Sequence, residues 1–155
     1  MKKLLSLLAI GAIVLGMASC GDKNSPEVKS EASEGGDFKI EVTYTAPTIF
    51  DFTITAEDET IYEKGYVYTY FYVSEFADLY LQYGDSKAFA EAVAKTYIAG
   101  YQQKGKTFED EATPGPALEE DIEVNAGEIC YIIAYRFNDN YQMVGNMSYV
   151  KVTPQ

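Results

Sequence analysis

The ten residues EICYIIAYRF, from Glu128 to Phe137, decide the fold of this chain. Successive side chains of a strand point to opposite faces, and here both faces are apolar or aromatic: one carries Cys130, Ile132 and Ala134, the other Tyr131, Ile133, Tyr135 and Phe137. The segment KGYVYTYFYVS, residues 64–74, has the same property. Because a strand with two apolar faces is usually covered on both, the sequence predicts two central strands between two layers of structure.

The second of these segments carries a row of tyrosines on one face. Val67, Phe71 and Val73 fall on the other face, and the row consists of Tyr66, Tyr68, Tyr70 and Tyr72. Flat aromatic rings with hydroxyl groups are suited to sugar rings, so the row is a candidate ligand platform. The alternative is a second core covered by helices, which is favoured because large aromatic surfaces are rarely left open. We expect helices to cover the tyrosine face.

Two strands that each have one solvent-exposed face precede these segments. Residues 38–45 and 50–55 alternate apolar and polar side chains, with period two. After a loop with Pro114 and Pro116, the pattern predicts a short strand over 121–124. A hairpin through residues 138–140 then leads into a last strand over 148–152.

Two helices are expected between the central strands. Residues 75–83 form a short helix that stops at Gly84, and Asp85 or Ser86 caps a longer helix that ends at Gly105. The predicted apolar stripe of the longer helix consists of Phe89, Ala92, Val93, Thr96, Tyr97 and Tyr101. The fold class is therefore mainly β with α (α+β), with a domain over 38–155 and a two-helix insertion at about 75–105 that covers one sheet face.

The first 20 residues are typical of a targeting segment. Lys2 and Lys3 precede an apolar run over 4–15 that is too short to span a membrane. The motif from Met17 to Cys20 resembles the lipobox of bacterial lipoproteins, which implies a signal peptide over 1–19 and a diacylated Cys20 at the mature N-terminus. Acyl chains would then attach the protein to a membrane. The alternative is an ordinary secretory peptide.

Residues 20–37 are predicted to be a lipidated, disordered tether. Between Gly21 and Asp37 only Val28 and Ala32 are apolar, which is too little to offset the entropy of ordering. The acidic residues Asp22, Glu27 and Glu31 resemble the export signal of Bacteroidetes lipoproteins. The resemblance implies an outer-membrane protein that faces the cell surface, with the periplasmic face as the alternative.

Composition excludes several classes of function. The chain has 24 acidic and 12 basic residues, a net charge of −12, and this charge repels nucleic acid. It has no histidine, which removes Ser-His and Cys-His catalysis and the commonest zinc ligand. With Cys20 lipidated, Cys130 is the one remaining thiol, so no intramolecular disulfide is expected. We assign no catalytic residues, no metal site and no cofactor.

Two further patterns were weighed as sites. The hairpin around Asp139 and Tyr141 is a candidate ligand or calcium site, although Asn and Asp are also the residues that turns select. Acidic clusters at 57–59, 109–111 and 119–121 could supply the carboxylate pair of a glycosidase. Solvated surface is the favoured interpretation of these clusters on so acidic a chain.

Three stretches resemble known folds. Val124 to Cys130 resembles the turn into the sixth strand of fibronectin type III domains, with Cys130 where that family has a tyrosine. The stretches Tyr70 to Phe76 and Ala134 to Asn140 resemble small Bacteroidetes lipoproteins with this domain and a helical insertion after the third strand. The resemblance implies an antiparallel fibronectin type III-like β-sandwich, and it implies no activity.

The sequence therefore supports three hypotheses. The leading one is a lipid-anchored, non-enzymatic binding or interaction module whose partner is a glycan or a protein. The second is a periplasm-facing structural or accessory subunit of an outer-membrane complex, and the third is a carboxylate-based glycosidase. The candidate ligand-binding residues are Tyr66, Tyr68, Tyr70, Tyr72, Asp139 and Tyr141.

Overall fold

The computed structural model describes residues 30–32 and 36–154 of the chain, and the side chains of 36–154. The predicted signal peptide, the predicted lipidation site Cys20 and most of the predicted tether lie outside the described residues. The structure is mainly β with helices, in agreement with the α+β class.

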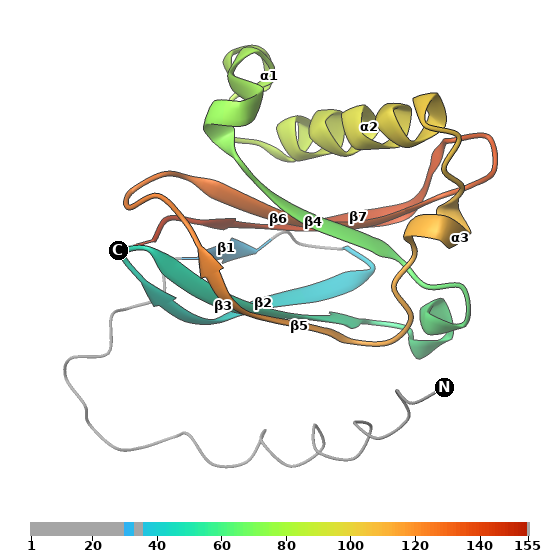
Figure 1. Cartoon of the computed structure of the whole chain (residues 1–155), viewed down its shortest axis with the longest axis horizontal. Helices are drawn as coiled ribbons and strands as arrows, with labels where there is room; N and C mark the ends of the chain where they lie inside the picture. Colours follow the sequence, from blue (N-terminus) through green and yellow to red (C-terminus); the bar gives the residue numbers. More distant parts are fainter. Residues whose placement is uncertain (1–29, 33–35, 155) are drawn as a thin grey trace.

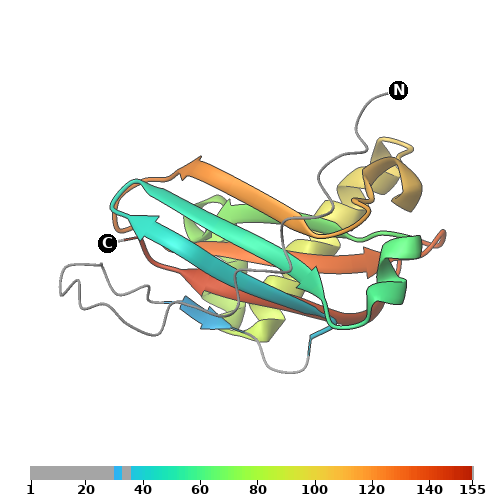
Figure 2. The same ribbon diagram turned by 90° about the horizontal axis from the view of Figure 1, so that it is seen from below.

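The strands form two antiparallel sheets that lie one above the other (Figure 1). The four-stranded sheet has the order β1 (Ser30–Ala32), β7 (Met143–Val152), β6 (Cys130–Phe137) and β4 (Val67–Tyr72). The three-stranded sheet has the order β2 (Phe38–Ala46), β3 (Ile49–Ala56) and β5 (Ala117–Glu123). Figure 2 shows β5, β3 and β2 side by side in front of the other sheet.

Apart from one short 3-10 helix, the described helices come after β4 in the chain. The 3-10 helix η2 (Glu59–Glu63) links β3 to β4, and η3 (Val73–Phe76), α1 (Ala77–Tyr83), α2 (Lys87–Gln103) and α3 (Phe108–Glu111) lie between β4 and β5. Ser86 caps α2 as expected, because its side chain accepts a hydrogen bond from the Phe89 amide. The predicted two-helix insertion is thus confirmed.

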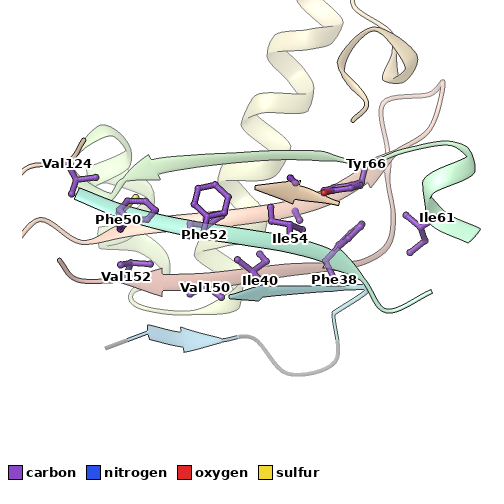
Figure 3. Packing of buried hydrophobic residues seen from close by; sticks show 14 residues of the cluster. Phe38, Ile40, Phe50, Phe52, Ile54, Ile61, Tyr66, Val124, Val150 and Val152 are labelled. Atoms are coloured by element: carbon purple, nitrogen blue, oxygen red, sulfur yellow. The ribbon is translucent and has the colours of Figure 1, made fainter. Parts of the chain in front are cut away.

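One hydrophobic cluster lies between the sheets (Figure 3). Phe50, Phe52 and Ile54 of β3 are fully buried in it, as their alternation predicts. They pack with residues of the facing sheet, namely Cys130, Ile132 and Ala134 of β6 and Val150 and Val152 of β7. One of the two apolar faces of β6 is therefore covered by the second sheet.

A second cluster lies between the four-stranded sheet and α2. The helix contributes Phe89, Ala90, Val93, Ala94 and Ile98, and the sheet contributes Val67, Phe71, Tyr131, Ile133, Tyr135, Phe137 and Met147. Figure 1 shows α2 lying across the outer side of β6 and β7. Both apolar faces of the quoted segment are thus covered, as predicted, whereas β4 is an edge strand of its sheet and not a central one. The buried stripe differs from the expected one: Thr96 is exposed, Ala92, Tyr97 and Tyr101 are half-buried, and Ala90, Ala94 and Ile98 are buried.

The helices cover the face opposite to the predicted one. Tyr66 is fully buried between the sheets, and Tyr68 and Tyr72 pack against the same inter-sheet cluster. The face beneath α2 carries Val67 and Phe71 instead. The prediction was wrong because both faces of β4 are aromatic, so alternation defines two faces without saying which layer each one meets.

The edge strands are less regular than the alternation suggests. β2 has a bulge between Val42 and Tyr44, after which Tyr44 is exposed and Thr45 is buried. A second bulge separates Phe50 from Phe52 in their pairing with β5, which extends over seven residues rather than the expected four. β7 is likewise longer than the predicted strand.

The predicted tether contains two ordered parts. Ser30–Ala32 pairs antiparallel with Val150–Val152 at the edge of β7. Asp37 forms an ion pair with Arg136 and accepts a hydrogen bond from the Asn146 amide. The prediction of a disordered tether is therefore wrong at these residues. Their contacts come from residues far along the chain, and local composition does not reveal such contacts.

Candidate functional site

A cavity lies at one end of the molecule, between η2, α3 and the turn that joins β6 to β7. Figures 1 and 2 both place these segments at the same end. The cavity has a volume of about 720 Å³ and is lined by Tyr62, Glu63, Lys64, Phe108, Glu109, Ala112, Pro114, Arg136, Phe137, Asn138, Asp139 and Val144. We call it the end pocket. Its size is in the range of small-molecule sites.

Local hydrogen bonds hold the three segments that form the end pocket. Asp58 caps η2 by accepting a 2.9 Å hydrogen bond from the Thr60 amide, and Thr107 and Asp110 form a capping box at α3. In the hairpin, Asn138 Oδ1 accepts hydrogen bonds from the amides of Asn140 and Gln142, at 3.0 Å each. Asn138 thus has the ordinary structural role that turns favour.

Stacked aromatic rings form the back of the end pocket. Phe137 is almost fully buried, and the edge-on ring of Phe108 lies 5.2 Å from it, between ring centroids. Tyr101 and Tyr141 stack on Phe137 at 5.8 and 6.0 Å. The Tyr62 ring also lines the pocket, and its hydroxyl accepts a 2.7 Å hydrogen bond from the Ala56 amide, which fixes the ring.

Arg136, the single arginine of the chain, lies at the base of the end pocket. Its guanidinium donates to Asp37 at 2.8 Å, and both side chains are mostly buried. Burial opposes ionisation of Asp37, but hydrogen bonds from the Asn146 amide and from Arg136 outweigh it and lower the pKa of the carboxyl group. A smaller cavity of about 360 Å³ adjoins the site and shares Glu63, Lys64 and Arg136 with the end pocket.

The rim of the end pocket is predominantly acidic. Glu63, Glu109 and Asp139 are exposed there, and Lys64 is the exposed base. Arg136 is already paired with Asp37. The accessible charge at the rim is therefore three carboxylates against one ammonium group.

The structure separates the six predicted ligand-binding residues. Asp139 lines the end pocket, and Tyr141 lies behind it against Phe137. The four tyrosines near β4 lie elsewhere: Tyr66 is fully buried, Tyr70 is 39% exposed, and Tyr68 and Tyr72 are half-buried. The sugar-platform interpretation needs exposed ring faces, which the fully buried Tyr66 lacks and which Tyr68, Tyr70 and Tyr72 offer only in part.

Two of these tyrosines join the sheets along one edge. The Tyr68 hydroxyl donates to the Glu119 carboxylate, and the Tyr72 hydroxyl donates to the Glu123 carbonyl oxygen at 3.2 Å. Burial and the hydrogen bond to Glu119 raise the pKa of Tyr68 to about 12. These phenols therefore act as neutral donors that link β4 to β5.

Cys130 is a buried core residue. Its side chain is fully buried in the inter-sheet cluster, and burial raises the pKa of the thiol to about 12. A thiol that stays protonated at neutral pH is a poor nucleophile. The placement agrees with the expectation of a small hydrophobic residue.

The sequence patterns did not identify most residues of the end pocket, among them Tyr62, Glu63, Lys64, Phe108 and Arg136. The sequence did contain one signal. Arg136 is a charged residue in a strand that is otherwise apolar, and it is the one residue of β6 that is not fully buried. Tyr62 and Phe108 fall in short helices next to loops and carry no periodic pattern.

Within the described residues, no group of three or more Cys, Asp or Glu side chains is arranged to hold a metal ion. No helix of this part of the chain has both the length and the apolar character needed to cross a bilayer. Comparisons with family models, with curated proteins and with solved structures found no match to the chain.

Proposed function

We propose that this protein is a lipid-anchored cell-envelope protein that acts as a non-enzymatic binding module, with the end pocket as its binding site. The observation that carries the proposal is the end pocket itself: a cavity of about 720 Å³ with aromatic walls and polar groups at its rim. Ligand sites in proteins combine these same features.

We further propose that the domain is a fibronectin type III-like sandwich. In sandwiches of the immunoglobulin type, the first, second and fifth strands share one sheet, and the third, sixth and seventh share the other. Without β1, the strands of this chain follow that pattern, with β2-β3-β5 in one sheet and β4-β6-β7 in the other. The helical segment stands where the fourth strand would be.

The anchoring part of the proposal rests on the lipobox-like motif that ends at Cys20. Intact-mass measurement of the protein extracted from membranes tests it. A mature chain that begins at Cys20 and carries acyl chains is the expected result. A chain without acyl groups would overturn the anchoring proposal and leave the binding proposal to be tested separately.

The binding part is tested by paired variants of two exposed or half-exposed aromatic residues. Phe108→Leu removes a ring from the end pocket but keeps an apolar side chain, whereas Tyr83→Leu removes a ring on α1. The variants are compared in pull-downs of membrane and secreted components from the native cells. Loss of retained components with Phe108→Leu alone supports the proposal, and equal retention by both variants contradicts it.

A second candidate, the accessory subunit of an outer-membrane complex, is favoured by α1. Leu81 is 84% exposed and Tyr83 is 41% exposed on this helix, so it offers an apolar surface to a protein partner. Protease treatment of intact cells separates the two functions. Digestion supports surface display, and protection supports the periplasm-facing subunit.

A further inference from the structure

The charge of the whole molecule favours cations at the end pocket. Acidic residues outnumber basic ones by 24 to 12, and such a field concentrates ions of opposite sign in clefts that carry the same bias. The rim repeats this bias, because it carries the three exposed acidic residues Glu63, Glu109 and Asp139 and one exposed base, Lys64. An anionic ligand would meet repulsion both on approach and at the rim.

The walls of the end pocket favour a cation with an apolar stem. The rings of Phe108 and Tyr62 line the cavity, and aromatic faces attract ammonium and guanidinium groups. Ala112, Pro114 and Val144 supply the apolar part of the lining. A hydrated metal ion would gain nothing from these walls, whereas an organic cation would use both parts of the lining.

We propose that the end pocket binds an organic cation, a guanidinium or ammonium group carried on an apolar stem. The inference rests on the proposed binding function and gives its ligand class. The aromatic rings pack against the stem and the cation, and the carboxylates of Glu63, Glu109 and Asp139 accept its hydrogen bonds. The charge comes from the side chain of a basic peptide or from a free amine, and the experiment distinguishes these two sources.

Lys64 allows a test in which a substitution is expected to strengthen binding. It is the one rim residue whose charge opposes a bound cation, so removing that charge strengthens binding. Lys64→Gln therefore raises the affinity, while Glu109→Gln lowers it. Asp78→Asn, on α1 at a distance from the end pocket (Figure 1), is the matched charge control and leaves the affinity unchanged.

The experiment is calorimetric titration of the purified full-length protein in nonionic detergent. The probes are acetyl-arginine amide, its neutral isostere acetyl-citrulline amide, and butylguanidine, which has the same single charge and no peptide backbone. The arginine probe is expected to bind about tenfold more tightly than the citrulline probe, because the neutral urea group lacks the attraction of a positive charge to the carboxylates and the aromatic faces. Its affinity falls as salt is raised toward about 0.1 M, where the screening length is about 10 Å.

The comparison of the two cationic probes identifies the source of the charge. Tighter binding of acetyl-arginine amide than of butylguanidine indicates a peptide side chain, and the reverse order indicates a free amine or guanidine without a peptide backbone. Phe108→Leu weakens both probes, while Tyr83→Leu weakens neither.

Three results would overturn the inference. They are equal affinity for the arginine and citrulline probes, weaker binding after Lys64→Gln, and no binding of either cation at millimolar concentration. If a neutral probe binds and Phe108→Leu abolishes its binding, the ligand class is wrong but the end pocket remains a binding site. The failure of this inference is thus distinguishable from the failure of the proposed function.

Discussion

Gly145 shows how a single residue holds the start of the domain against the β6–β7 hairpin. Its φ is +69°, and a side chain there would collide with the carboxylate of Asp37 and the guanidinium of Arg136. The ion pair between these residues is 2.8 Å long and mostly buried. The absence of a side chain at position 145 is therefore required both by the backbone and by the ion pair.

We expect Gly145→Ala to destabilise the domain more than Gly127→Ala does. Both glycines have positive φ, so each substitution has a backbone cost of about 1 kcal/mol. Only at position 145 does the added methyl group also displace the ion pair, since no atom lies within 4 Å at position 127. Urea unfolding of both variants measures the difference. Equal losses would show that the ion pair tolerates the methyl group.

The lowered pKa of Asp37 makes stability depend on pH. A carboxyl group with a lower pKa in the folded state stabilises the fold above its unfolded pKa, about 3.9, and loses this contribution as the pH falls through the folded value. Asp37→Asn therefore reduces the free energy of unfolding at pH 7. It also makes the loss of stability below about pH 4 smaller than in the unmodified protein. Denaturant midpoints between pH 7 and 2.5 test this. The exposed residue Asp78, changed to Asn, is the control, and an unaltered acid decline in Asp37→Asn would contradict the argument.

At the level of elements, α2 is the helix that covers the second apolar face of β6. Ile98 is almost fully buried against the four-stranded sheet, whereas Leu81 on α1 is 84% exposed. A further link is made by Asp85, just before α2, which accepts hydrogen bonds from Tyr131 of β6 and Lys151 of β7. The helical insertion is therefore part of the folded core.

Truncating the two aliphatic residues on these helices tests that role. Ile98→Ala should lower the free energy of unfolding by about 2–5 kcal/mol, as for other buried aliphatic side chains. Leu81→Ala should change it by about 0.5 kcal/mol or less. Chemical denaturation of both variants provides the values. A small loss for Ile98→Ala would mean that α2 packs only loosely on the sheet.

Prediction from the sequence succeeded where one element alone determines the pattern. The strong alternation of Phe50, Phe52 and Ile54 and the cap at Ser86 both appear in the structure as expected. It failed at β4 because a strand with two aromatic faces contains no signal for which sheet or helix it meets. It also failed at Tyr44, because a bulge reverses the faces and alternation assumes that there is none.

For the whole molecule, the order of the elements was predictable but the end pocket was not. The pocket joins Tyr62, Phe108 and Arg136, which come from three segments far apart in the sequence. Nothing local marks these segments as neighbours, since the contact follows from how the two sheets and α3 pack. Asp139 was identified because it lies in a hairpin, and hairpins are visible in sequence.

The central claim is that the end pocket is where this protein binds its ligand. The most direct test is to record amide NMR spectra of the ¹⁵N-labelled protein during titration with acetyl-arginine amide. We predict that the shifts concentrate on η2, α3 and the β6–β7 hairpin, with α1 and the exposed face of β2 unchanged. Shifts that concentrate on α1 or on the tyrosines of β4, with no shifts at the end pocket, would contradict the account.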